Sequence, residues 1–243
     1  MLFDAHIHLS EIPKVEQGRP LPASVLTSAH DPEDPSLSLG DPAVLCSYGL
    51  HPLWLDAPGR SLETLVKLSA SGQISAVGEF GFDFYHGRDR EKEKKQRDFF
   101  HAQCVIAERY RLPVVLHARR GMAELFNETT LLKKLSAVIF HCYPGTAEEG
   151  QAFLKRGVNG FFSFGTPIIK NYPRAIAALK RLPLDRILFE TDAPFQPPHG
   201  REMSLPIDIV TVYEKGSELL SIPRPELEHI VWGTAQGIFP GRL

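Results

Sequence analysis

Residues 113–117 read Pro-Val-Val-Leu-His and residues 137–141 read Ala-Val-Ile-Phe-His, so a short apolar run ends twice in a histidine. Each run is too short for a helix and is rich in β-branched side chains, which favours a buried strand. The strict alternation of a half-exposed strand is absent, as expected for a parallel strand covered on both faces. The two runs therefore predict strands of a parallel sheet, each with an imidazole at its carboxyl end.

The same kind of run recurs along the chain and predicts eight strands. They occupy residues 2–5, 24–27, 44–48, 74–78, 113–116, 137–140, 158–162 and 186–189. Apolar side chains at helical spacing are clearest over residues 90–111, 121–135, 146–156 and 171–182. Alternating strands and helices over about 250 residues are typical of an α/β fold of the TIM-barrel type, (β/α)8. We predict one such domain over residues 1–243.

The first third of the chain departs from this alternation. Residues 9–22 and 29–43 are rich in Pro, Gly, Ser and Asp and lack helical periodicity. We therefore expect the first two helices of the barrel to be shortened or replaced by loops.

Composition excludes several classes of protein. Hydrophobic residues make up 43% and charged residues 23% of the chain, which excludes wholesale disorder. No window approaches the roughly 20 apolar residues of a membrane helix, and the N-terminus lacks the pattern of a signal peptide. The cysteines Cys46, Cys104 and Cys142 lie far apart, which disfavours a disulfide framework or a zinc finger. We expect a cytoplasmic protein that does not associate with membranes.

The formal net charge of -2 limits how nucleic acid could be bound. A protein whose affinity comes mainly from neutralising phosphates is usually basic. Contacts with nucleic acid would therefore be local and made through metal ions, which suits a small, end-on substrate and argues against wrapping long duplexes.

Side chains that ligate metals concentrate at the predicted strand ends, where barrels of this kind carry their active sites. In chain order they are His6, His8, His51, Glu79, His117, His141 and Asp192. His6 and His8 lie two apart on one face of a strand, and paired imidazoles suit a first-row divalent metal. Glu79 follows a buried run, where a carboxylate needs a cation or a proton.

Each of these residues also has an ordinary structural explanation. Glu79 could cap a helix, His117 and His141 could be packed core histidines, and Asp192 could nucleate a turn before prolines. Taken together these explanations fail, because they would require ligand-type residues to occur at one strand end after another by chance. The sequence therefore predicts a metal centre at the barrel mouth.

Six motifs, in order, resemble the TatD family of metal-dependent deoxyribonucleases and hydrolases, within the amidohydrolase-like barrels. They are Phe3-Asp-Ala-His-Ile-His-Leu, Tyr48-Gly-Leu-His-Pro, Val77-Gly-Glu-Phe-Gly-Phe-Asp-Phe-Tyr, Leu112-Pro-Val-Val-Leu-His-Ala-Arg, Phe140-His-Cys-Tyr-Pro-Gly and Leu188-Phe-Glu-Thr-Asp-Ala-Pro. The match runs from residue 3 to about residue 195, with a weaker trace to the end.

The resemblance implies a centre of two divalent metal ions, with Zn, Mn, Mg and Fe as the candidates. One ion would be held by His6, His8 and Asp192 and the other by His117 and His141, with the Glu79 carboxylate bridging them. Two such ions lower the pKa of a bound water and stabilise the oxygens of a phosphodiester under attack. Glu79 and Asp192 would then be the catalytic residues, Asp192 as the general base.

Four further residues are candidates for substrate binding. Arg119 could fork onto a phosphate oxygen, and His51 could contact the scissile phosphate or the leaving group. Asp83 and Tyr85 could orient a ligand histidine or stack on a base. The alternatives are a surface salt bridge for Arg119, a packed turn for His51 and structural pairing for Asp83 and Tyr85.

The sequence thus predicts a metal-dependent hydrolase acting on ester bonds, foremost a deoxyribonuclease of the 3'-5' exonuclease type. Its partners would be DNA ends or another small phosphodiester substrate, and we expect a monomer. The alternative is an ester or amide hydrolase, including one that deacylates aminoacylated nucleic acid, because the same activated water can attack a carbonyl. A non-catalytic barrel would have lost ligands, and none is lost.

Overall fold

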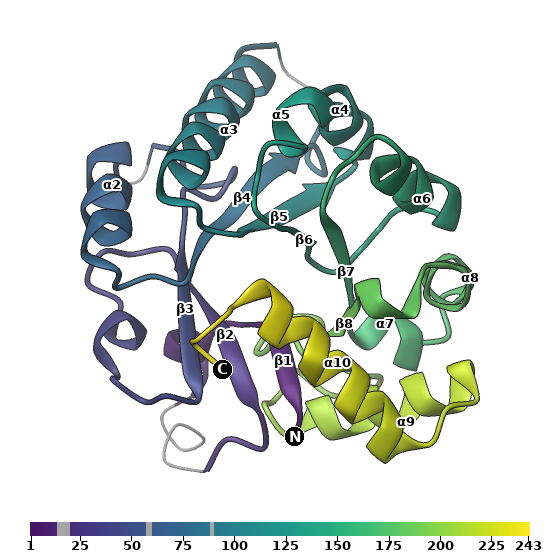
Figure 1. Cartoon of the computed structure of the whole chain (residues 1–243). Coiled ribbons are helices and arrows are strands. Elements are labelled where there is room, and N and C mark those ends of the chain that lie inside the picture. The colour runs from purple at the N-terminus through teal and green to yellow at the C-terminus, as the bar shows by residue number, and fades with distance from the viewer. Residues whose placement is uncertain (14–19, 57–59, 88–89) are drawn as a thin grey trace.

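A computed structural model, which describes residues 1–13, 20–56, 60–87 and 90–243, confirms the TIM-barrel architecture. Each strand of the eight-stranded sheet pairs in parallel with the next along the chain. The strands are β1 (Phe3–Ile7), β2 (Ser24–Ala29), β3 (Val44–Tyr48), β4 (Ala76–Asp83), β5 (Val114–Arg119), β6 (Val138–Phe140), β7 (Gly160–Phe164) and β8 (Ile187–Phe189). Figure 1 shows the helices arranged as a ring around them.

The α-helices of the described residues are α2 (Leu62–Ser71), α3 (Arg90–Tyr110), α4 (Met122–Asn127), α5 (Thr129–Leu132), α6 (Ala147–Lys155), α7 (Thr166–Ile169), α8 (Pro173–Arg181), α9 (Asp208–Leu220) and α10 (Arg224–Ile238). The helix predicted over residues 121–135 is in fact two, because the backbone at Glu128 (φ -89°, ψ 10°) leaves the α-helical region. Four helices of the described residues lie outside the stretches that the spacing predicts, namely α2, α7, α9 and α10.

The two connections expected to be short carry only 3-10 turns in their described parts. Turn η1 (Leu9–Glu11) follows β1, and η2 (Pro35–Ser38) follows β2, while η3 (Leu184–Arg186) precedes β8. Residues 14–19 of the first connection lie outside the described residues. The second connection confirms the expectation that a helix is replaced by a loop.

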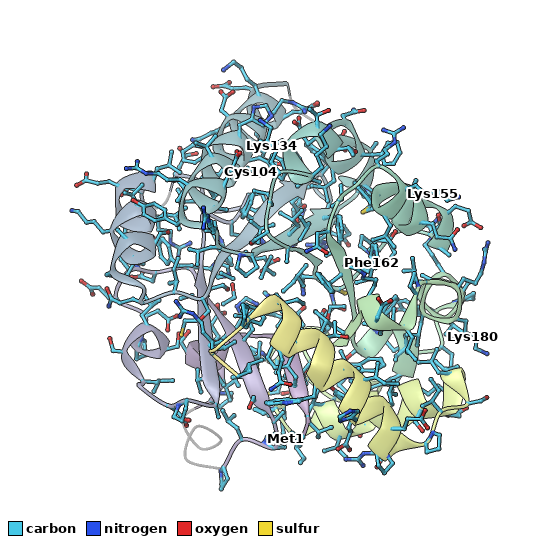
Figure 2. All side chains as sticks on the ribbon, in the orientation of Figure 1. Met1, Cys104, Lys134, Lys155, Phe162 and Lys180 are labelled. Carbon is cyan, nitrogen blue, oxygen red and sulfur yellow. The ribbon has the colours of Figure 1, made fainter. Side chains whose placement is uncertain are left out.

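Aromatic side chains on the outer face of the strands pack against the surrounding helices. Phe82 of β4 stacks on Phe100 of α3 with ring centroids 5.0 Å apart, and Phe140 of β6 packs on Phe153 of α6 at 4.8 Å. Phe162 of β7 stacks on Phe140 at 5.3 Å and lies toward the middle of the view, whereas Lys155 and Lys180 lie near its edge (Figure 2). Because neighbouring residues of a strand point to opposite faces, this packing directs Asp83 and the chain at residue 141 toward the barrel interior.

The barrel closes between β1 and β8 through polar contacts. The backbone N–H of Asp192 donates to the His6 carbonyl over 2.9 Å. The buried carboxylate of Asp4 accepts from the backbone N–H (3.0 Å) and hydroxyl (2.7 Å) of Thr191. Helix α10 packs across both strands, as Figure 1 shows. The seam of the barrel therefore ties His6 and Asp192 together.

Two further expectations can be compared with the described residues. Cys46, Cys104 and Cys142 are free, in agreement with the absence of a disulfide framework. Among the helices of the described segments, none has both the length and the apolar character needed to cross a bilayer.

Gly81 is a position in β4 where a side chain cannot be accommodated. Its φ is +153°, and an added Cβ would overlap the carbonyl oxygen of His117 on β5. We expect Gly81→Ala to lower the free energy of unfolding by about 2–5 kcal/mol, from backbone strain and overpacking combined. Urea denaturation measures the change.

The matched control is Gly233→Ala in α10, where an added Cβ meets no atom within 4 Å. It should raise the free energy of unfolding by about 0.5–1 kcal/mol, because alanine is the better helix former. A Gly81→Ala protein as stable as the original chain would contradict the close packing of β4 on β5.

Candidate metal centre

A cavity of about 600 Å³ opens at the carboxyl ends of the strands. The ligand-type side chains on its wall come from separate strands or from the residues just after them: His8, His30, His51, Glu79, His117, His141 and Asp192. Each of them is at most 8% exposed, and His6 is fully buried beside them. The structure thus brings together, in one buried group, all the residues predicted to ligate metal.

Local irregularities of the strands aim two of these side chains. The β1 ladder shifts register between Asp4 and Ile7, around His6, and the β4 ladder shifts between Val77 and Phe80, around Glu79. Bulges of this kind redirect side chains next to active sites. Strand β4 also continues to Asp83, so Glu79 lies within the strand instead of ending it.

The Glu79 carboxylate lies at the middle of the group, and its two oxygens face different histidines. Oε1 lies 2.5 Å from His117 Nδ1 and 3.7 Å from the Nε2 atoms of His51 and His141. Oε2 lies 3.3 Å from His6 Nε2 and 3.9 Å from His8 Nε2. Glu79 therefore separates a half of the centre near β3, β5 and β6 from a half near β1.

Asp192 lies on the β1 side of the centre. Its Oδ1 is 3.4 Å from His8 Nε2 and 3.8 Å from His6 Nε2, while Oδ2 is 3.9 Å from His141 Nε2. The backbone of Asp192 has a φ of +57°, a conformation that aspartate tolerates better than most residues. This turn directly after β8 directs the carboxylate back into the barrel.

The spacing of these atoms fits a bound cation better than direct hydrogen bonds. Most of the nitrogen–oxygen separations lie between 3.3 and 3.9 Å, beyond the usual 2.7–3.2 Å of a hydrogen bond. Two ligand atoms that share a zinc ion, each about 2.1 Å from it, can lie up to about 4.2 Å apart. His6, His8 and Asp192 also offer three ligand atoms within 4.8 Å of one another. The residues present therefore fit the divalent metal that the sequence predicts.

The electrostatics of the cluster set the charge of each candidate donor. Burial alone would raise the pKa of the Glu79 carboxyl, but the surrounding histidines, led by His141, hold it well below its usual range. Burial lowers the pKa of His51 to about 3, so this imidazole stays neutral with lone pairs available. At His8, His117 and His141 the neighbouring carboxylates outweigh burial and raise the pKa, at His141 to about 10, so a divalent ion would displace protons from these imidazoles on binding.

Two carboxylates outside the central group position the ligand histidines. Asp83 Oδ2 lies 2.9 Å from His117 Nε2, which directs the other ring nitrogen at Glu79. Glu190 Oε1 lies 3.0 Å from His141 Nδ1 and accepts the backbone N–H of Cys142 over 2.8 Å. Carboxylates commonly hold the far nitrogen of metal-bound histidines. The position of Asp83 thus favours orienting a histidine, one of the two roles considered for it.

The sequence reasoning missed His30, which directly follows β2 and faces the centre. The apolar run predicts a strand that ends at residue 27, whereas β2 continues through Ser28 and Ala29. Neither of these two small residues belongs to the bulky apolar run, so the run alone predicts too early an end for the strand. Had the run been extended, the rule that located the other ligands would have reached His30.

Arginine and aromatic side chains line the rim of the cavity. Arg119 is 43% exposed along its side chain and lies 3.6 Å from Asp83 Oδ2, with its guanidinium carbon 3.9 Å from the centroid of the Tyr85 ring. Trp54 lies against His51 with ring centroids 4.7 Å apart, and Phe195 lies edge-on to His8 at 5.1 Å. Among the four predicted substrate contacts, His51 lies within the group of candidate metal ligands. The ring of Tyr85 is covered by the guanidinium of Arg119.

Comparisons with known proteins agree with the fold and with a metal-dependent hydrolase. The family model described as TatD related DNase matches residues 3–240. An uncharacterized metal-dependent hydrolase of Bacillus subtilis, YabD, is 30% identical over 204 residues, which cover 81% of this chain and 77% of that protein. The 3'-5' ssDNA/RNA exonuclease TatD of Musicola paradisiaca is 33% identical over 156 residues, or 60% of this chain and 56% of that one. The crystal structure of YJJV, a TATD homolog from Escherichia coli K12, superposes with a TM-score of 0.82 at 25% identity, covering 98% and 97% of the two chains.

Removal of metal should destabilise the folded protein, because only the folded chain assembles this donor set. A metal present at 100 times its dissociation constant adds about 2.7 kcal/mol per site to the free energy of unfolding. We expect the thermal midpoint to fall after dialysis against EDTA and to return when Zn²⁺ or Mn²⁺ is added. Differential scanning calorimetry gives the shift, and a midpoint that is indifferent to both treatments would contradict a metal centre.

Proposed function

The chain belongs to the TatD family of metal-dependent hydrolases, and we propose that it hydrolyses phosphodiester bonds at the ends of DNA strands, in the 3'-5' direction. The observation that carries this proposal is the Glu79 carboxylate, whose two oxygens face separate groups of buried histidines. Such a carboxylate can bridge two cations, and paired cations stabilise both the attacking and the leaving oxygen of a phosphodiester. The monomeric state and the cytoplasmic location stay predictions.

His6, His8 and Asp192 would hold one of the ions, and His117 and His141 the other. Bound divalent ions supply a water of lowered pKa and positive charge at the phosphate. The chain's own residues would orient this water and accept its proton. Burial would raise the pKa of the Asp192 carboxyl, but its histidine neighbours, led by His141, hold it below its usual value, so it is ionised and can accept a proton.

The rim of the cavity suits a nucleotide. Trp54 and Phe195 present exposed aromatic surface beside the centre, at 37% and 42% exposure, on which an unpaired base can stack. Arg119 and Arg174 line the same cavity and can pair with phosphate oxygens. These local cations meet the need for charge in a chain whose net charge is -2.

The relatives support the same substrate class. The Musicola paradisiaca protein is a 3'-5' exonuclease of single-stranded DNA and RNA by its name, and the similarity covers 60% of the chain described here. The aromatic rim is consistent with an unpaired strand end, because the faces of paired bases are already stacked inside a duplex.

Asp192→Asn should abolish nucleotide release from end-labelled single-stranded DNA by the metal-loaded enzyme. Loss of a general base lowers kcat by about 10²–10⁴-fold, and the loss of a metal-facing carboxylate adds to this. The matched control is Asp185→Asn, an exposed aspartate at η3, which should leave the rate unchanged. Turnover of a generic carboxylester without nucleotide release would instead favour the ester hydrolase.

Trp54→Ala should weaken the binding of oligonucleotides more than it affects the chemistry. Stacking of one base on an aromatic side chain contributes about 1–3 kcal/mol, so KM for single-stranded DNA should rise by about 5–150-fold. The hydrolysis of bis-p-nitrophenyl phosphate, which has no base, is the internal control and should keep its kcat/KM. Equal losses on both substrates would show that Trp54 supports the metal centre and does not stack on a base.

A further inference from the structure

His30 stands among the proposed metal ligands without belonging to the set that the family resemblance implies. It directly follows β2, is 5% exposed, and has no hydrogen-bond partner on either ring nitrogen among the described residues. An unpaired polar group in a buried position costs about 1–3 kcal/mol. A packed core histidine would normally have a partner for at least one nitrogen, so this imidazole calls for another explanation.

The geometry aims His30 at the centre. Its Nε2 lies 3.9 Å from Glu79 Oε2, the same separation that His8 Nε2 has from that oxygen. His8, His30 and Glu79 each offer a ligand atom within 4.8 Å of the other two. Trp54 packs edge-on against the imidazole with centroids 5.1 Å apart.

With His30 included, each oxygen of Glu79 faces three imidazoles. Oε1 faces His51, His117 and His141. Oε2 faces His6, His8 and His30. The Glu79 carboxylate thus lies between two sets of three imidazoles. Neither hydrogen bonding nor the packing of residues after β2 requires such an arrangement.

We propose that His30 is a metal ligand, a further imidazole donor beside His6 and His8 for the ion on the Glu79 Oε2 side, where Asp192 and Glu79 supply oxygens. Histidines in this number are a known donor set for zinc. Because imidazole suits zinc and iron while magnesium prefers oxygen ligands, His30 biases this half of the centre toward Zn²⁺ or Fe²⁺. This assignment rests on the proposed two-ion centre but not on the identity of the substrate.

The test compares the metal-free forms of the full chain, its His30→Ala variant and its His229→Ala variant in titrations with Zn²⁺ against a competing chelator. His229 is an exposed histidine of α10 and serves as the matched control. We expect His30→Ala to weaken one of the two zinc sites by more than about 100-fold, beyond the 10–100-fold of a residue that only positions a ligand. The affinity for Mg²⁺ should change less, and His229→Ala should bind like the original chain. A smaller loss of zinc affinity overturns the proposal.

A second variant guards against a folding defect. His30→Gln fills a similar volume, and far-ultraviolet circular dichroism of both metal-free variants verifies the fold. With Co²⁺ in place of zinc, His30→Gln should change the visible absorption of the bound ion, because one nitrogen donor is lost. An unchanged Co²⁺ spectrum in the folded variant overturns the ligand assignment.

The same preparations separate this inference from the proposed function. DNA cleavage together with a zinc affinity that is indifferent to His30 would reject the ligand and keep the nuclease. A zinc site that depends on His30 in a protein that releases no nucleotide would keep the ligand and reject the nuclease.

Discussion

A carboxylate buried among imidazoles is the constraint around which the mouth of this barrel is built. Glu79 is 3% exposed, and an ionised carboxylate in such a place has to be matched by positive charge. Histidines on both sides supply that match in part, and their separations of mostly 3.3–3.9 Å leave space for cations. The bulge in β4, the glycine beside β5 and the polar seam between β1 and β8 all serve to hold this group in position.

The centre and the barrel are stabilised by the same residues. Asp4 and Thr191 join β1 to the segment after β8, and that junction also sets the position of His6 and Asp192. Outside the strands, aromatic packing such as Phe82 on Phe100 fixes which side chains of β4 face inward. Catalytic geometry in this fold therefore depends on the outer hydrophobic layer as much as on the ligands, since a shift of one residue along a strand would exchange the two faces.

The cavity combines two chemistries, which under the proposed function would bind a strand end of nucleic acid. The buried floor is rich in nitrogen ligands, whereas the rim carries exposed aromatic rings and arginines, with Arg119 held between Asp83 and Tyr85. Under the proposed function, a phosphate bound at the floor would place its attached base at the level of Trp54 or Phe195. This division would let a weakly acidic protein bind a polyanion over a short stretch and not along its length.

Local sequence patterns determined most of the fold and most of the ligand set. Short apolar runs that end in His117 or His141 identify parallel strands and their carboxyl ends. They do so because strand formation and burial depend on residues that are adjacent in the sequence. The tertiary structure decided what depends on distant parts of the chain: which oxygen of Glu79 faces which histidines, that His51 lies beside Oε1, and that His30 lies beside Oε2. These relations arise from strands brought together by barrel closure and from a bulge within β4, and no spacing along a single strand encodes them.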